Sequence, residues 1–211
     1  DIGPRKADIT NDSYRIVAGV KGTISSRWNW DTYYSYDNDK VVDVTSNAIS
    51  ESRLRASLAK STPDALNIFG GANYRNPKST LDAIRVTTQK GGYSTLDLWH
   101  GQISGDLFEL PTGTLGGAFL LETRKEKFGE ANDAISTTLD DIIGQVKLAD
   151  STDARRTVDS VAMELNAPLV KPGTIKFLHS LSLTAAGRFE KFSEGYDSGV
   201  KPYYGIRYQP F

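Results

Sequence analysis

Residues 28–36 read WNWDTYYSY, and this stretch decides the fold class. One alternate set of positions holds mainly large aromatic side chains: Trp28, Trp30, Thr32, Tyr34 and Tyr36. The positions between them hold Asn29, Asp31, Tyr33 and Ser35. Because successive side chains of a strand point to opposite faces of a sheet, a period of two predicts a β-strand with one aromatic face.

Six further segments show the same period: residues 13–24, 96–110, 114–125, 156–167, 175–191 and 200–209. In residues 156–167, for example, Val161, Met163 and Leu165 alternate with Ser160 and Glu164. The predicted apolar faces carry no Asp, Glu, Lys or Arg at the strand centres. We therefore predict an all-β fold, an antiparallel sheet of about seven long strands.

The segment 96–110 contains one change of phase. Leu96 and Leu98 have the opposite parity to Ile103 and Leu107. A β-bulge near His100 would bring these apolar residues to one face, and we expect a bulge there.

Alternation alone leaves two architectures open, because an antiparallel sheet packed on a soluble core shows the same pattern as a membrane barrel. The connections favour the barrel. Short connections at residues 25–27, 111–113 and 169–174 alternate with long ones at residues 37–95 and 126–155. Outer-membrane barrels of bacteria combine short periplasmic turns with long extracellular loops in this way. The sequence thus predicts a segment of a transmembrane β-barrel.

The aromatic residues of the strands fit this interpretation. Trp and Tyr concentrate where a bilayer meets water, because their rings are apolar and their tips are polar. We expect such an interfacial position for six residues: Trp28, Trp30, Tyr34, Tyr36, Tyr204 and Tyr208. The alternative is an aromatic ladder in the core of a soluble sandwich.

Composition limits the possible partners and chemistry. The chain has 211 residues and a net charge of −1, which does not indicate a nucleic-acid partner. It has no cysteine, so disulfides and thiolate metal sites are excluded. Short helical patterns occur at residues 51–60, 79–86 and 136–146, and none of them shows a distinctive cap.

Several motifs occur in a fixed order along the chain. RIVAGVKGTISSRWNWDTYYSY at residues 15–36 is followed by SGDLFELPTGTLGGAFLLETRKE at residues 104–126. MELNAPLV, LSLTAAGRFEKFS and VKPYYGIRYQP then follow at residues 163–170, 181–193 and 200–210. In this order they resemble the barrel of TonB-dependent outer-membrane receptors.

Individual positions match that family's pattern. Glu122 and Arg124 form the Glu-x-Arg pair that follows a Leu-Pro-x-Gly turn. Glu164 stands shortly before a Pro-Leu turn, and Arg188 stands in a Gly-Arg-aromatic strand end. The resemblance runs from about Tyr14 to Pro210, and its specificity lies in the order of the motifs.

The resemblance implies a function and a set of partners. Such a receptor imports a scarce solute, for example a siderophore or other metal chelate, a vitamin or an oligosaccharide. It lies in the cell outer membrane of a Gram-negative bacterium, and its surface loops capture the ligand. A plug domain then rearranges under the action of the energy-transducing TonB complex. The implied partners are outer-membrane lipid, the plug domain, the TonB complex and the solute, with no enzyme activity and no cofactor.

The sequence also departs from the family. Residues 67–70 read NIFG, where family members often have Asn-Pro-Phe-Gly, and nothing resembles a plug domain. A receptor of this kind closes about 22 strands. We therefore expect residues 1–211 to be a fragment of the barrel domain that cannot transport a solute alone.

The candidate site residues fall into two groups. Seven charged residues are expected on a polar, lumen-facing surface: Glu122, Arg124, Glu164, Arg188, Glu190, Lys201 and Arg207. They are expected to form a salt-bridge lattice rather than a substrate path, because a barrel interior is polar by construction. Phe69, Tyr74 and Tyr93 are candidates for ligand contact in the long loops.

No catalytic or metal-binding motif is evident. His100 and His179 are far apart and lack a metal-binding spacing, and no Gly-x-Ser-x-Gly elbow occurs. Asp140 and Asp141 are adjacent, which makes paired acid–base chemistry improbable. We therefore expect no catalytic residue and no metal. The alternative function from the residues is a soluble β-sandwich carbohydrate-binding module.

Overall fold

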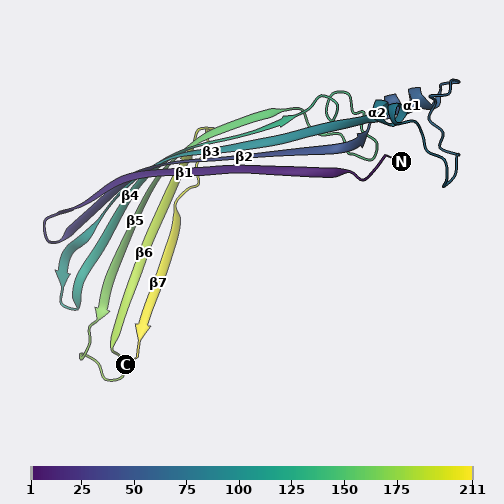
Figure 1. The fold of residues 1–211 in the computed structure, drawn as a ribbon. Coiled ribbons are helices and arrows are strands. Elements are labelled where there is room, and N and C mark those ends of the chain that lie inside the picture. Colours follow the sequence, from purple (N-terminus) through teal and green to yellow (C-terminus); the bar gives the residue numbers. More distant parts are fainter. Residues whose placement is uncertain (1, 211) are drawn as a thin grey trace. The chain divides into compact units, whose positions relative to one another are not determined.

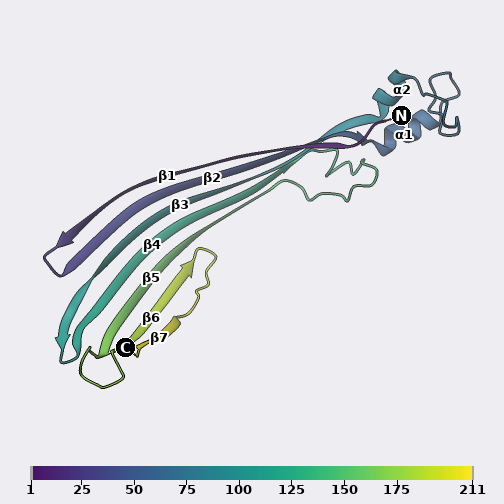
Figure 2. The same cartoon turned by 60° about the horizontal axis from the view of Figure 1, so that its bottom comes forward.

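The computed structural model describes residues 2–210, which form one open antiparallel sheet of seven strands. The strands are β1 (Lys6–Ile24), β2 (Trp28–Ile49), β3 (Arg85–Leu110), β4 (Gly113–Asn132), β5 (Thr152–Val170), β6 (Ser180–Phe192) and β7 (Lys201–Gln209). Each strand lies beside its sequence neighbours, from β1 in purple to β7 in yellow, in both views (Figure 1 and Figure 2). The predicted all-β class and seven antiparallel strands are confirmed.

Two short helices interrupt the connection between β2 and β3: α1 (Glu51–Leu58) and α2 (Lys78–Ile84). They confirm two of the three helical patterns. The third predicted helix, residues 136–146, is wrong. This segment forms turns, and its backbone hydrogen bonds are those of a loop. Neither helix of the described residues has the length and apolar character needed to cross a membrane.

Several strands extend beyond their predicted ends. β1 begins at Lys6 and β3 at Arg85, while β2 continues to Ile49. These extensions carry polar residues on both faces, so the sequence period fades although the backbone pairing continues. Conversely, β6 begins at Ser180, and residues 175–179 form a turn with one isolated bridge from Ile175 to Leu178.

The chain divides into two compact units. The first unit consists of Asp1–Ser13, Asp39–Ser94 and Phe128–Ala154, and it contains both helices. The second unit consists of Tyr14–Asn38, Thr95–Lys127 and Arg155–Phe211.

The first unit contains a small apolar core. Leu66, Leu81 and Ile84 form this core, and Leu54 of α1 packs against it. Ser50 caps α1, because its side chain accepts a hydrogen bond from the backbone N–H of Arg53. The expectation of a helix without a distinctive cap is therefore wrong for α1; a serine at the N-cap position was the available signal.

Asp141 fastens the connection 133–151 to the start of α1. Its carboxylate accepts a hydrogen bond from the backbone N–H of Ser52 at 2.6 Å and further bonds from the hydroxyls of Ser50 and Ser52. These bonds lower the pKa of Asp141, the bond from Ser50 most of all. The role of Asp141 is thus to anchor a loop.

In the second unit, the registers of β5, β6 and β7 fix which residues share a face. Residues directly opposite in an antiparallel pair lie on the same side of the sheet. Val161 is opposite Phe189, and Leu183 is opposite both Ala167 and Ile206. The same registers place Ser160 opposite Glu190. The predicted apolar and polar faces of these three strands are therefore correct.

We call the face that carries Val161, Leu183 and Phe189 the apolar face. On β5 to β7 it consists of Val161, Met163, Leu165, Ala167, Leu181, Leu183, Ala185, Gly187, Phe189, Pro202, Tyr204, Ile206 and Tyr208. Met163 is 54% exposed, Tyr204 75% and Ile206 76%. Within residues 2–210 no second sheet covers this face, so the aromatic residues do not form the core of a sandwich.

Two glycines on β1 and β3 leave room for the tryptophans of β2. A Cβ atom at Gly22 would lie 2.9 Å from Nε1 of Trp30. A Cβ atom at Gly105 would lie 2.8 Å from Cδ2 of Trp28 and 2.3 Å from the carbonyl oxygen of Arg27. Trp28 and Trp30 thus lie against glycines of the two neighbouring strands, where any larger residue would collide with them.

The predicted bulge at His100 is not needed. The Tyr34 hydroxyl donates a hydrogen bond to Asp97, and Trp99 lies against Gly101 on the same face. His100 is buried on the other face. Alternation therefore continues through β3 without a change of phase. The face that carries Ile103 and Leu107 continues with Trp99 and Asp97, and not with Leu98 and Leu96 as the predicted bulge required.

Candidate functional site

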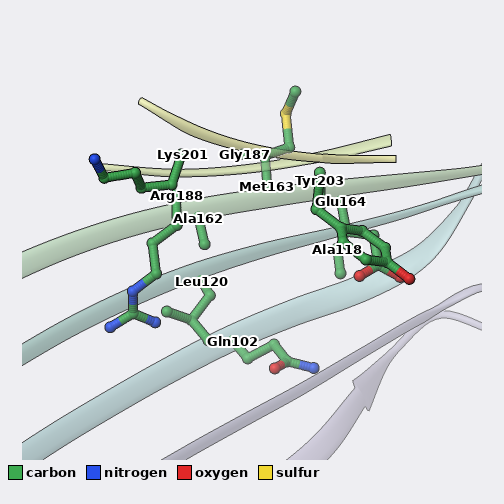
Figure 3. A pocket seen from close by; sticks show the side chains of 11 residues that line it. Gln102, Ala118, Leu120, Ala162, Met163, Glu164, Gly187, Arg188, Lys201 and Tyr203 are labelled. Atoms are coloured by element: carbon green, nitrogen blue, oxygen red, sulfur yellow. The ribbon is translucent and has the colours of Figure 1, made fainter. Parts of the chain in front are cut away.

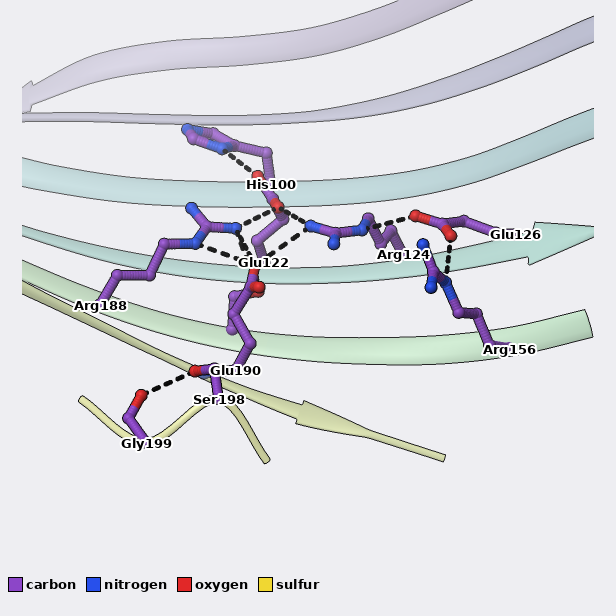
Figure 4. A network of polar contacts seen from close by, with 10 residues as sticks. His100, Glu122, Arg124, Glu126, Arg156, Arg188, Glu190, Ser198 and Gly199 are labelled. Carbon is purple, nitrogen blue, oxygen red and sulfur yellow. Dashed lines mark hydrogen bonds and ion pairs between the residues drawn. The ribbon is translucent and has the colours of Figure 1, made fainter. Parts of the chain in front are cut away.

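The face opposite the apolar face carries a network of charged side chains, which we call the charged network (Figure 4). Glu122 of β4 accepts a hydrogen bond of 2.8 Å from Arg188 of β6. Arg188 also donates to Glu190 at 3.0 Å and to the Ser160 hydroxyl at 3.1 Å. Ser160 in turn donates to Glu190 at 3.1 Å, so three strands are joined by one set of contacts.

Arg124 extends the charged network along β4. It donates to Glu126 at 2.7 Å and to Glu190 at 3.2 Å, and it lies 3.5 Å from Glu122. Arg156 of β5 donates to the other oxygen of Glu126. Charges of opposite sign alternate throughout, which compensates the partial loss of water around each of them.

His100 lies at the edge of this network. Its Nδ1 is 3.7 Å from Oε2 of Glu122, and its Nε2 is 3.7 Å from Oδ2 of Asp31. The ring stacks on Tyr33 with 4.6 Å between centroids. Both carboxylates are beyond hydrogen-bond range, and Nδ1 is buried with no hydrogen-bond partner in the described structure.

A hollow of about 220 Å³ adjoins the charged network (Figure 3). Its floor is formed by the small side chains of Ala118, Ala162 and Ala186 on three neighbouring strands. Glu164 and Arg188 rise beside them. The hollow exists because alanines replace long side chains at these alternate positions. Met163 also touches it, but Figure 3 shows its side chain on the opposite side of the sheet from Arg188.

The structure separates the seven predicted lumen-facing residues into three sets. Glu122, Arg124, Arg188 and Glu190 meet in the charged network. Glu164 and Lys201 line the hollow. Arg207 lies opposite Ser182 on the same face, outside both groups.

The six predicted interfacial aromatics all lie in strands. Trp28 and Trp30 begin β2, next to the turn at residues 25–27. Tyr36 contacts Tyr14 of β1 with 5.9 Å between ring centroids. Tyr204 and Tyr208 lie on the apolar face of β7, opposite Ala185 and Leu181. Tyr34 lies on the aromatic face of β2, together with Trp28, Trp30 and Tyr36.

The three loop candidates have different surroundings. Phe69 is highly exposed in the connection between α1 and α2. Tyr74 packs its ring against Gly70 in the same connection. Tyr93 is not in a loop: it lies in β3, packs against Gly129 and donates a 2.7 Å hydrogen bond to Asp153. Its placement in a loop was wrong because β3 begins earlier than the sequence period indicated.

Besides Ser160, which was predicted only as a member of the polar face, four members of the site were missed from the sequence. Glu126 lies one residue past the predicted segment 114–125, and Arg156 is the first residue of the predicted segment 156–167. Both continue the parity of Glu122 and Ser160, and this parity was the available signal. His100 and Asp31 have no local signal, since only the pairing of β2, β3 and β4 brings His100 between Asp31 and Glu122.

The charged network consists of ion pairs and hydrogen bonds between neighbouring strands. Among residues 2–210 no three His, Asp or Glu side chains are placed to hold a metal ion. Every carboxylate of the charged network has a cation or hydroxyl partner, so none is free to act as a general base. The arrangement can hold three strands in register and present a polar surface.

No protein-family model matches the sequence, and no curated protein matches it significantly.

Proposed function

We propose that this chain forms part of the barrel wall of a TonB-dependent receptor in the bacterial outer membrane. The observation that carries the proposal is the common end of the apolar face on three strands. Leu121, Val161 and Phe189 are the last apolar residues, and the next positions on that face are Thr123, Asp159 and Lys191. A bilayer boundary produces such a row, whereas the rim of a soluble core has no reason to follow one line.

The height of the apolar face supports the same proposal. On β5 it runs from Val161 to Ala167 and continues, after an irregularity in register between Pro168 and Val170, with Val170 opposite Leu181. A tilted strand crosses the hydrocarbon region with about 9–11 residues. The strand then continues to Thr152 with mostly polar residues, as a barrel strand does above a membrane.

The charged network and the hollow lie on the other face, where a barrel of this class is polar and wet. In this proposal the network is structural and lines the interior. The solute, the plug domain and the TonB complex belong to the proposed receptor as a whole. The solute class expected for it is a metal chelate, a vitamin or an oligosaccharide, moved without covalent chemistry.

The alternative, a soluble β-sandwich module, has no specific support in the described residues. A sandwich needs a second layer over the apolar face, and the seven strands form one sheet.

Detergent phase partitioning tests the proposal. Because seven strands leave edges at β1 and β7 and an uncovered apolar face, the purified chain should enter the detergent phase and aggregate without detergent. A chain that stays monomeric in water and unfolds cooperatively would rule out the membrane assignment.

A further inference from the structure

The connection between β5 and β6, residues 171–179, lies where the apolar face ends on these strands. It leads to Leu181, the first apolar residue of β6 on that face. The row of polar residues at Asp159 borders the opposite end of the apolar face on β5. The connection is held against the neighbouring turn, because Nζ of Lys171 donates a 3.3 Å hydrogen bond to the carbonyl oxygen of Pro111. This end of the apolar face is therefore bordered by a connection of defined position.

Lys176 and Phe177 stand at the tip of a β-turn in this connection. The N–H of Leu178 donates to the carbonyl oxygen of Ile175 at 3.2 Å and closes the turn. Phe177 has a φ of 67°, a conformation that turns usually give to Gly or Asn, because a bulky residue is strained in it. Phe177 is nevertheless 69% exposed, and Ile175 is 50% exposed. Packing within the chain therefore does not account for an aromatic residue at this strained position.

The charge of this part of the second unit has one sign. Residues 165–189 include no Asp or Glu, and β7 has none either. Lys171 bonds to a neutral carbonyl, and Nζ of Lys176 lies over the ring of Phe177, 5.3 Å from its centroid. Glu109, at the end of β3, accepts its hydrogen bonds from a threonine hydroxyl. The two lysines of the connection are thus not neutralised by a carboxylate of the described residues.

We propose that the connection 171–179 binds the headgroups of anionic phospholipids at the membrane surface. The inference rests on the proposed function, since it takes this end of the apolar face as the second boundary of the bilayer. It adds a partner to that function: lipids with a net negative headgroup. Lys171 and Lys176 contact the phosphates, while the side chains of Ile175 and Phe177 enter the interface beside them.

The two kinds of side chain in the connection fit this partner together. Lysines are attracted to an anionic surface, and exposed aromatic and aliphatic side chains are stabilised when they leave water for the interface. A free anion would contact Lys171 and Lys176 but leave Ile175 and Phe177 in water. Since the whole chain has a net charge of −1, attraction to anionic lipid has to come from this local arrangement.

Fluorescence quenching in vesicles measures the lipid next to the connection. The chain has no cysteine, so Thr174→Cys, at an exposed position of the connection, can carry a single bimane label. The vesicles contain phosphatidylcholine and phosphatidylglycerol, and either lipid carries bromine close to its headgroup. At equal mole fractions, we expect brominated phosphatidylglycerol to quench the label about two- to fourfold more than brominated phosphatidylcholine. Inorganic phosphate, added at constant ionic strength, should not change this ratio.

Three variants of the labelled chain separate the contributions, with circular dichroism as the check on folding. The double variant Lys171→Gln/Lys176→Gln should bring the quenching ratio to about one. Lys201→Gln, the matched control, removes the same charge from the polar face, opposite Arg188, and should leave the ratio unchanged. Phe177→Gly should retain the fold, because Gly adopts a positive φ without strain, and should reduce quenching by both lipids alike.

Three results would overturn the inference: equal quenching by the two lipids, an unchanged ratio in the double lysine variant, or loss of the preference when inorganic phosphate is added. In each of these cases the label still meets lipid, so the proposed function would stand. No quenching by either lipid would show that the chain does not enter the bilayer, and it would overturn the proposed function together with this inference.

Discussion

The Thr123 hydroxyl of β4 donates a hydrogen bond of 2.7 Å to the Asp159 carboxylate of β5. This polar pair lies on the apolar face, immediately beyond Leu121 and Val161. On β6, Lys191 is directly opposite Asp159. Three neighbouring strands therefore change from apolar to polar at one level, and this relationship underlies the proposed membrane boundary.

Because of this boundary, the loss of stability caused by a new charge should depend on the position of that charge along the strand. Leu165→Arg places a charge in the middle of the apolar stretch of β5, whereas Thr123→Arg places one in the polar row. In lipid vesicles we expect a loss of about 2–4 kcal/mol in unfolding free energy for Leu165→Arg and about 0–1 kcal/mol for Thr123→Arg. Denaturant titration of vesicle-folded protein measures both. Equal losses in the two variants would contradict the boundary.

The charged network should behave as a coupled unit. Glu122→Gln leaves Glu190 as the one carboxylate paired with Arg188, so we expect about 1–2 kcal/mol of lost stability in detergent, moderated by partial exposure. Glu164→Gln, on the same face but outside the network, should change stability by less than about 0.5 kcal/mol. A double-mutant cycle of Glu122→Gln and Arg188→Gln measures the coupling, and strictly additive effects would show that the network is not cooperative.

Asp141 should make the anchoring of α1 depend on pH. Because hydrogen bonds lower its pKa in the folded state, its stabilisation is complete above about pH 4 and is lost as the pH falls through the lowered pKa. Asp141→Asn should raise amide exchange at Ser52 about three- to tenfold near neutral pH and abolish the acid dependence.

Asp140→Asn is the matched control for this experiment. Asp140 has a positive φ of 48°, which Asn tolerates, and its substitution should leave exchange at Ser52 unchanged. Comparison of variants at the same pH removes the intrinsic pH dependence of exchange. Identical acid profiles in both variants would show that Asp141 does not anchor the helix.

Gly105 should resist even the smallest substitution. Gly105→Ala would bring a Cβ atom to 2.3 Å from the carbonyl oxygen of Arg27, so strand β3 or the turn must shift. We expect a loss of about 1–3 kcal/mol and a changed tryptophan fluorescence spectrum, since Trp28 lies beside it. Gly116→Ala has its nearest such contact at 4.0 Å and should leave both unchanged. Equal tolerance at the two positions would contradict this packing.

The sequence predicted the parts of the fold that alternate strongly. β5 and β6 were predictable because Val161, Met163 and Leu183 must share a face. The outer parts of β2 and β3 were not, because a strand that is polar on both faces has no period to detect. Tyr93 was placed in a loop for this reason.

The site was predictable to a similar degree. The charges of Glu122 and Arg188 could be assigned to one face, but their direct contact depends on how β4, β5 and β6 are staggered. The contacts of Asp141 with Ser50 and Ser52 gave no sequence signal, because they arise where the long connection 133–151 folds back on α1. Pairing across many residues of chain is not encoded in any local pattern.

The most direct test of the central claim is the lipid accessibility of β5, residue by residue. Since the chain has no cysteine, single Cys substitutions from Thr157 to Ala167 can each carry a nitroxide label in lipid vesicles. Collisions with oxygen report contact with acyl chains, and collisions with a water-soluble nickel chelate report contact with water. The account predicts oxygen contact at Val161, Met163 and Leu165, with alternation that stops at Asp159. Nickel contact at every position, without alternation, would show that the apolar face does not lie in lipid.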